Sequence, residues 1–75
     1  MKKQIESIIN EMKAQANNIS RISRLANKLM RLAGGTALGY FIACVQIAAE
    51  DFDGDDFYIK WMIDDLSDAF EEIAA

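Results

Sequence analysis

Apolar residues recur at a helical spacing along the first 33 residues of the chain. With Ile5 as position a of a seven-residue repeat, the a and d positions are apolar with one exception, Gln15. No Gly or Pro interrupts residues 2–33. We therefore predict one long helix. Its weak point is Asn17-Asn18, because Asn18 is also a suitable first residue (N-cap) for a second helix, and a kink or break there stays open.

The next segment, residues 36–49, is apolar on all sides of a helical wheel. Gly34-Gly35 is expected to end the first helix and Thr36 to cap this one. A helix that is hydrophobic all round has to be covered on every side. Because a monomer of three helices offers it only two neighbours, we expect a homodimer that buries this central helix between chains.

The last segment is amphipathic. The turn at residues 50–56 is acidic, and Asp55 or Asp56 is expected to cap the helix that follows. That helix has an apolar stripe made of Ile59, Met62, Ile63, Leu66, Phe70 and Ile73. The chain is long enough for a single domain, residues 1–75. The sequence thus predicts an all-α bundle of three helices, completed by homodimerisation.

Charge is sorted along the chain. Residues 1–33 carry seven basic and two acidic side chains, residues 34–49 carry none, and residues 50–75 carry one Lys and ten carboxylates. The net charge is −4. A basic end and an acidic end separated by an uncharged segment indicate binding surfaces, and the excess of carboxylates favours a partner protein with a basic surface.

The acidic face of the last helix gives the sharpest functional signal. Carboxylates near a helix C-terminus oppose the helix dipole, so local helix stability does not explain them. The wheel places Phe57 and Trp61 on the same side, and an exposed Trp beside carboxylates is typical of a binding hot spot. The alternative is that a dimer mate covers both aromatic rings. The predicted partner-binding residues are Phe57, Trp61, Asp64, Asp65, Asp68, Glu71 and Glu72.

A basic stripe on the first helix is a second candidate surface. It consists of Arg21, Arg24, Lys28 and Arg31, which can reach nucleic-acid phosphates. The chain as a whole is acidic, however, and no nucleic-acid-binding motif or interleaved aromatic residue accompanies the stripe. We interpret it as a solvated face, or one matched to the acidic last helix, and keep nucleic-acid binding as an alternative function.

Catalytic and metal chemistry are not favoured. The chain has no His and a single Cys, Cys44, which argues against zinc. Asp51, Asp53 and Asp55 have the alternate spacing of calcium ligands, but the register of a calcium loop fails at Asp56 and Met62. No nucleophile or phosphate-loop motif is present. We expect no enzymatic activity, no cofactor and no metal.

A membrane location is the main rival on architecture. Residues 32–49 are uncharged, with basic residues before them and acidic residues after, which resembles a short span oriented positive-inside. Three Gly and Gln46 weaken this reading, so a buried helix is favoured and a single-span membrane protein is the alternative. Charged residues occupy the start of the chain where a signal peptide is apolar, and we expect a cytoplasmic protein without a secretion signal.

These observations converge on a small acidic protein that regulates or inhibits another protein without catalysis. Closely spaced carboxylates can imitate a phosphate backbone, so the partner could be one that normally holds nucleic acid. Virus-encoded inhibitors of host proteins share the small size, the acidity and the lack of a catalytic site, which is an analogy and not a motif.

Overall fold

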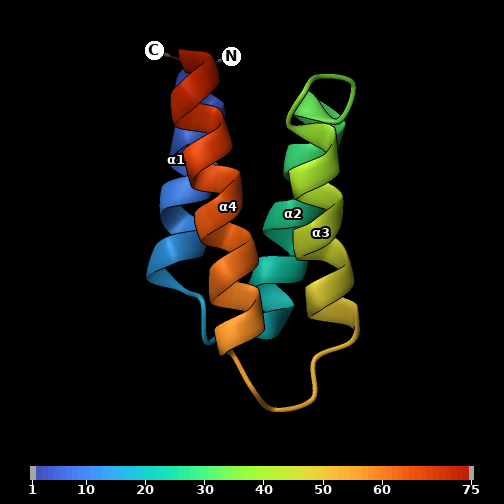
Figure 1. Cartoon of the computed structure of the whole chain (residues 1–75). Coiled ribbons are helices and arrows are strands. Elements are labelled where there is room, and N and C mark those ends of the chain that lie inside the picture. Colours follow the sequence, from blue (N-terminus) through green and yellow to red (C-terminus); the bar gives the residue numbers. More distant parts are fainter. Residues whose placement is uncertain (1, 75) are drawn as a thin grey trace.

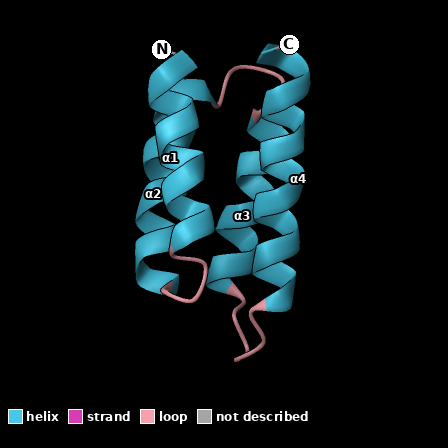
Figure 2. Ribbon diagram, turned by 90° about the vertical axis from the view of Figure 1, so that its left-hand side faces the viewer, coloured by secondary structure: helices cyan, strands magenta, loops and turns pink. Residues whose placement is uncertain are grey.

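The chain folds into an up-and-down bundle of antiparallel helices. The computed structural model describes residues 2–74, which form α1 (Lys2–Ala14), α2 (Ile19–Ala33), α3 (Gly39–Glu50) and α4 (Phe57–Ala74) (Figures 1 and 2). Each helix packs against the next in sequence and α1 packs against α4, so the four surround a common core with α2 and α4 at opposite corners. The all-α prediction is confirmed, but the described residues form four helices where we predicted three.

The additional helix arises from a break in the predicted long first helix. Gln15, Ala16 and Asn17 form a turn, and Asn18 has extended backbone angles (φ −107°, ψ 90°). Its side-chain oxygen accepts a hydrogen bond from the Arg21 backbone N–H at 3.2 Å, as an N-cap does. An unbroken helix over residues 2–33 would be about 48 Å long, whereas the bundle extends 34 Å. Folding back lets the two halves of the apolar stripe bury one another.

The core draws on all four helices. The predicted heptad positions are buried, apart from Gln15 and Ile19, which are half-buried at the turn. The stripe of α4 is also buried, except that Met62 is half-buried and Ile73 is exposed. The most completely buried large side chains are Ile9, Met12, Ile22, Leu29, Ile42, Val45, Ile59, Ile63 and Leu66.

The turn between α2 and α3 starts the central helix later than predicted. The Thr36 hydroxyl donates to the Ala33 carbonyl at 2.6 Å and accepts from the Leu38 N–H at 3.1 Å, so it stabilises the turn and does not cap α3. The helix begins at Gly39, where a side chain would collide with the Gly34 carbonyl. The central helix is therefore twelve residues long, shorter than the predicted 36–49.

The loop between α3 and α4 is organised by its acidic residues. Asp53 accepts a hydrogen bond from the Asp55 N–H at 3.1 Å, and Asp55 accepts one from the Phe57 N–H at 3.0 Å. The prediction that Asp55 or Asp56 caps the last helix is confirmed for the Asp55 side chain. Gly54 has φ +103°, a left-handed conformation that favours glycine.

Candidate protein-binding surface

The predicted partner-binding residues lie together on the outer side of α4. Phe57 and Trp61 are one helical turn apart, and their side chains are 62% and 61% exposed. The five predicted carboxylates are also exposed, on the side of α4 that faces away from the core. We call this set the acidic ridge: Asp64, Asp65, Asp68, Glu71 and Glu72.

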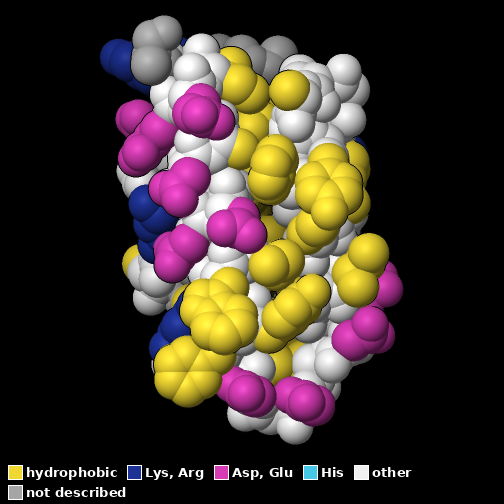
Figure 3. Space-filling model, in the orientation of Figure 1, with side chains coloured by type: hydrophobic (Ala, Val, Ile, Leu, Met, Phe, Trp, Pro, Cys, Tyr) yellow, Lys and Arg dark blue, Asp and Glu magenta, His cyan; other side chains and the backbone are white. Residues whose placement is uncertain are grey.

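Exposed hydrophobic side chains extend this surface from α4 onto α3. Among residues 2–74, every exposed large hydrophobic side chain lies on α3, on α4 or in the loop that joins them. Figure 3 shows such side chains as a band over both helices, with carboxylates along the outer side of α4 and around the loop. We call this set the apolar band: Tyr40, Ile47, Phe52, Phe57, Tyr58, Trp61 and Ile73.

Sequence reasoning identified the α4 part of the surface and missed the α3 part. Tyr40 and Ile47 are 74% and 55% exposed, although we expected the central helix to be covered all round. The signal was present in the sequence, since no charged residue lies between positions 34 and 49. We attributed this uncharged stretch to a contact between the two chains of a homodimer. The homodimer stays a prediction, and the open side of α3 is where a contact that buries this helix would lie.

The apolar band contains no Asp, Glu, Lys or Arg. The pKa of the Tyr40 hydroxyl is raised above its ordinary value, first by a side-chain hydrogen bond with Cys44, one turn along α3, and also by the nearby Tyr58. Tyr40 also meets Phe41 edge to face, with ring centroids 5.4 Å apart. The result is a neutral aromatic centre with carboxylates outside it.

A shallow recess lies where the loop meets this surface. Ile47, Phe52 and Tyr58 contribute apolar walls, and Asp51, Asp53 and Asp55 contribute carboxylates, around a volume of about 290 Å³. Arg and Lys side chains combine a long apolar stem with a cationic head. The recess therefore offers apolar walls to the stem of such a side chain and carboxylates to its cationic head.

The acidic ridge is largely free of internal ion pairs. Within residues 2–74, the only carboxylate of the loop or α4 that forms a salt bridge is Asp56, with Lys60 at 3.2 Å. The ridge carboxylates remain exposed and available to an external cation. Such exposed charges act mainly on the rate and the specificity of association.

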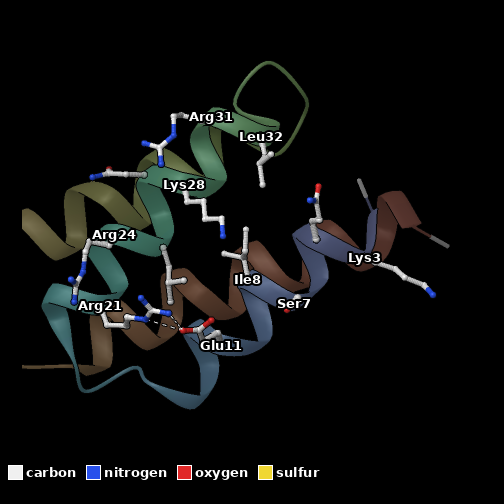
Figure 4. A pocket seen from close by; sticks show the side chains of 12 residues that line it. Lys3, Ser7, Ile8, Glu11, Arg21, Arg24, Lys28, Arg31 and Leu32 are labelled. Atoms are coloured by element: carbon white, nitrogen blue, oxygen red, sulfur yellow. Dashed lines mark hydrogen bonds and ion pairs between the residues drawn. The ribbon is translucent and has the colours of Figure 1, made fainter.

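The opposite side of the bundle carries a basic groove between α1 and α2. Its volume is about 690 Å³, and Ile8, Leu25 and Leu32 contribute apolar lining. Figure 4 shows Arg21 turned toward Glu11 and Lys28 directed across the groove from α2. The basic residues that line the groove are Lys3, Arg21, Arg24, Lys28 and Arg31.

The predicted basic stripe thus forms one wall of a groove and is not matched to the acidic last helix of the same chain. Arg21 forms an ion pair with Glu11, and its Nε donates to that carboxylate at 2.8 Å. Because α2 and α4 lie at opposite corners of the bundle, they are not packed against each other. In the described part of the chain, Arg24, Lys28 and Arg31 have no carboxylate partner.

The rival membrane interpretation rests on residues 32–49, which the turn at 34–38 divides between two helices. None of the described helices combines the length and the apolar character that a bilayer crossing requires. Within residues 2–74, no three His, Cys, Asp or Glu side chains come together as a cation site.

Compared with models of protein families, with curated proteins and with solved structures, the chain shows no match.

Proposed function

We propose that this protein binds another protein through the apolar band and the acidic ridge, and acts as a non-enzymatic regulator or inhibitor. The observation that carries the proposal is the one-sided distribution of exposed hydrophobic side chains, all on α3, α4 or their loop within residues 2–74. A contiguous exposed apolar patch with a polar rim is characteristic of an interaction site. Scattered surface hydrophobes would show no such preference for one side.

The composition of the surface favours a protein partner with an apolar patch bordered by Lys or Arg. Trp and Tyr are enriched at binding hot spots, where their rings become buried inside a polar rim. Here Trp61, Tyr58 and Tyr40 are all more than half exposed, beside carboxylates on α4 and in the loop. The recess at Ile47 and Phe52 suits the stem of a basic side chain from the partner.

The spacing of the ridge supports the more specific proposal that the partner normally holds nucleic acid. Asp64, Asp68 and Glu71 recur at four and three residues, so their carboxylates line one side of α4 over about 10 Å. A line of closely spaced negative charges presents the same electrostatic pattern as a phosphate backbone. A protein bound at its nucleic-acid site by this ridge would be inhibited by competition.

The test is affinity capture from extracts of the cells in which the protein is naturally made, with variants of matched charge. Trp61→Ala and Asp68→Lys are each expected to reduce capture of the specific partner at least tenfold, with unchanged helicity by circular dichroism. Glu11→Lys, the same charge reversal on the α1–α2 side of the bundle, serves as the control and is expected to retain capture. If all four proteins capture the same partner equally, the surface is not the binding site.

A further inference from the structure

The basic groove on the opposite side of the bundle is built for an elongated acidic ligand. Arg24, Lys28 and Arg31 follow one another at four and three residues along α2, and Lys3 lies on α1 across the groove. Arg21 is already paired with Glu11. The remaining cations border an apolar floor, a combination that fits the acidic face of an amphipathic helix better than it fits a single small anion.

The same chain carries a complementary surface on α4. Read from the C-terminal end, Glu72, Asp68 and Asp65 are separated by four and three residues, the spacing of Arg24, Lys28 and Arg31. An antiparallel helix laid beside α2 would therefore place three carboxylates beside three cations over about 10 Å. Trp61 precedes Asp65 by one turn on the outer side of α4, which in this arrangement places it level with Gly35, just past the end of α2.

We propose that the acidic ridge of one copy of this protein docks into the basic groove of a second copy. The groove lies between α1 and α2, and the ridge lies on α4, so one copy uses a different surface from its neighbour. Such a head-to-tail contact leaves a groove free at one end of the pair and a ridge free at the other. It therefore generates a ring or an open chain of copies, and not a closed two-fold dimer.

A second copy fits the groove better than nucleic acid does. The floor contributed by Ile8, Leu25 and Leu32 is aliphatic and provides no aromatic ring on which a base could stack. The acidic charge elsewhere on the molecule, which has a net charge of −4, would repel a long polyanion. An acidic helix presents its charge on one face only and places apolar side chains beside it.

This contact goes beyond the proposed function but shares the ridge with it, so partner and second copy compete for α4. The two can be separated experimentally, because the groove lies on the side of the bundle away from the apolar band. Variants of the groove are expected to lose self-association and to retain partner capture. Undiminished partner capture by Trp61→Ala and Asp68→Lys, with self-association lost in the groove variants, would contradict the proposed function alone.

Sedimentation velocity with complementary variants tests the proposal. The wild-type chain is expected to exceed its monomer mass of 8.4 kDa increasingly with concentration at low salt. It should return toward the monomer at about 0.5 M salt, because screening weakens exposed ion pairs. Arg24→Gln with Lys28→Gln removes two of the groove charges, and Asp65→Asn with Asp68→Asn removes two of the ridge charges. Each double variant alone is expected to be monomeric.

The equimolar mixture of the two double variants is decisive. One supplies an intact ridge and the other an intact groove, so the mixture is expected to form a one-to-one pair and nothing larger. Circular dichroism verifies that both variants keep the helicity of the wild type. The proposal is overturned if the mixture stays monomeric, or if the groove variant associates as the wild type does. It is also overturned if the wild type stays monomeric and its groove instead binds a single-stranded DNA oligonucleotide in a salt-dependent manner.

Discussion

At the scale of single residues, Asn18 determines where the chain reverses between α1 and α2. Its side chain accepts a hydrogen bond from the backbone of Arg21, one of the N–H groups that the first turn of α2 leaves without a helical partner. Asn18→Ala removes that acceptor, and we expect the free energy of unfolding to fall by about 1 kcal/mol. Urea unfolding followed by circular dichroism measures the change.

Asn17→Ala provides the matched control for this prediction. Asn17 is exposed in the preceding turn, and its side chain makes no hydrogen bond within the described residues. Its replacement is expected to change stability by less than about 0.5 kcal/mol. Equal losses for the two variants would mean that the cap does not stabilise the break, and that the turn is set by packing of the two helices alone.

At the scale of helices, periodicity predicted which residues enter the core but not how many helices carry them. Ile5, Met12, Ile22 and Leu29 occupy heptad positions whether the chain is one helix or two, so the apolar repeat leaves the break undecided. Tertiary packing selects two helices over one, since folding back at Asn18 supplies the partner surface that a long helix would lack. Local signals such as the Asp55 cap were predictable because both partners are neighbours in sequence.

The two sides of α4 have separate roles, which a pair of substitutions on this helix can distinguish. Leu66 is fully buried, and Leu66→Ala is expected to cost about 2–5 kcal/mol of unfolding free energy through lost burial and a cavity. Trp61 is 61% exposed, and Trp61→Ala is expected to cost less than about 1 kcal/mol. Thermal and urea unfolding of both variants measure the difference. A comparable loss for Trp61→Ala would show that its ring is part of the folded core and not of a binding surface.

At the scale of the whole molecule, charge sorted along the sequence becomes charge sorted across the bundle. The basic groove is on the α1–α2 side, whereas the carboxylates gather on α4 and its preceding loop. The sequence predicted the carboxylates of the ridge and the cations of the α2 wall, because helical wheels separate exposed from buried positions, but not the α1 wall of the groove. The separation of α2 from α4 was not predictable, since it depends on the order of helices around the core, and that order follows from the break at Asn18, which the sequence left open.

The placement of the ridge and the groove on different sides of the bundle distinguishes two modes of self-association, a two-fold dimer and a head-to-tail contact. A two-fold dimer that buries the open side of α3 would bring two acidic rims together, and like charges placed opposite each other oppose association. A head-to-tail contact avoids this repulsion because it joins ridge to groove. Ile47 is 55% exposed near the C-terminal end of α3, and it does not line the groove. We therefore expect Ile47→Asp to leave the sedimentation mass of the wild type unchanged at every salt concentration.

The same variant should weaken partner capture, because it places a charge within the apolar band. Its fold is expected to persist, since an exposed substitution away from the core changes stability little. A fall in mass to the monomer for Ile47→Asp, with Arg24→Gln and Lys28→Gln having no effect, would instead establish the two-fold dimer through α3. The hydrophobic stretch at residues 36–49 would then be explained by self-association, and the exposed aromatic residues of α4 would remain for the partner.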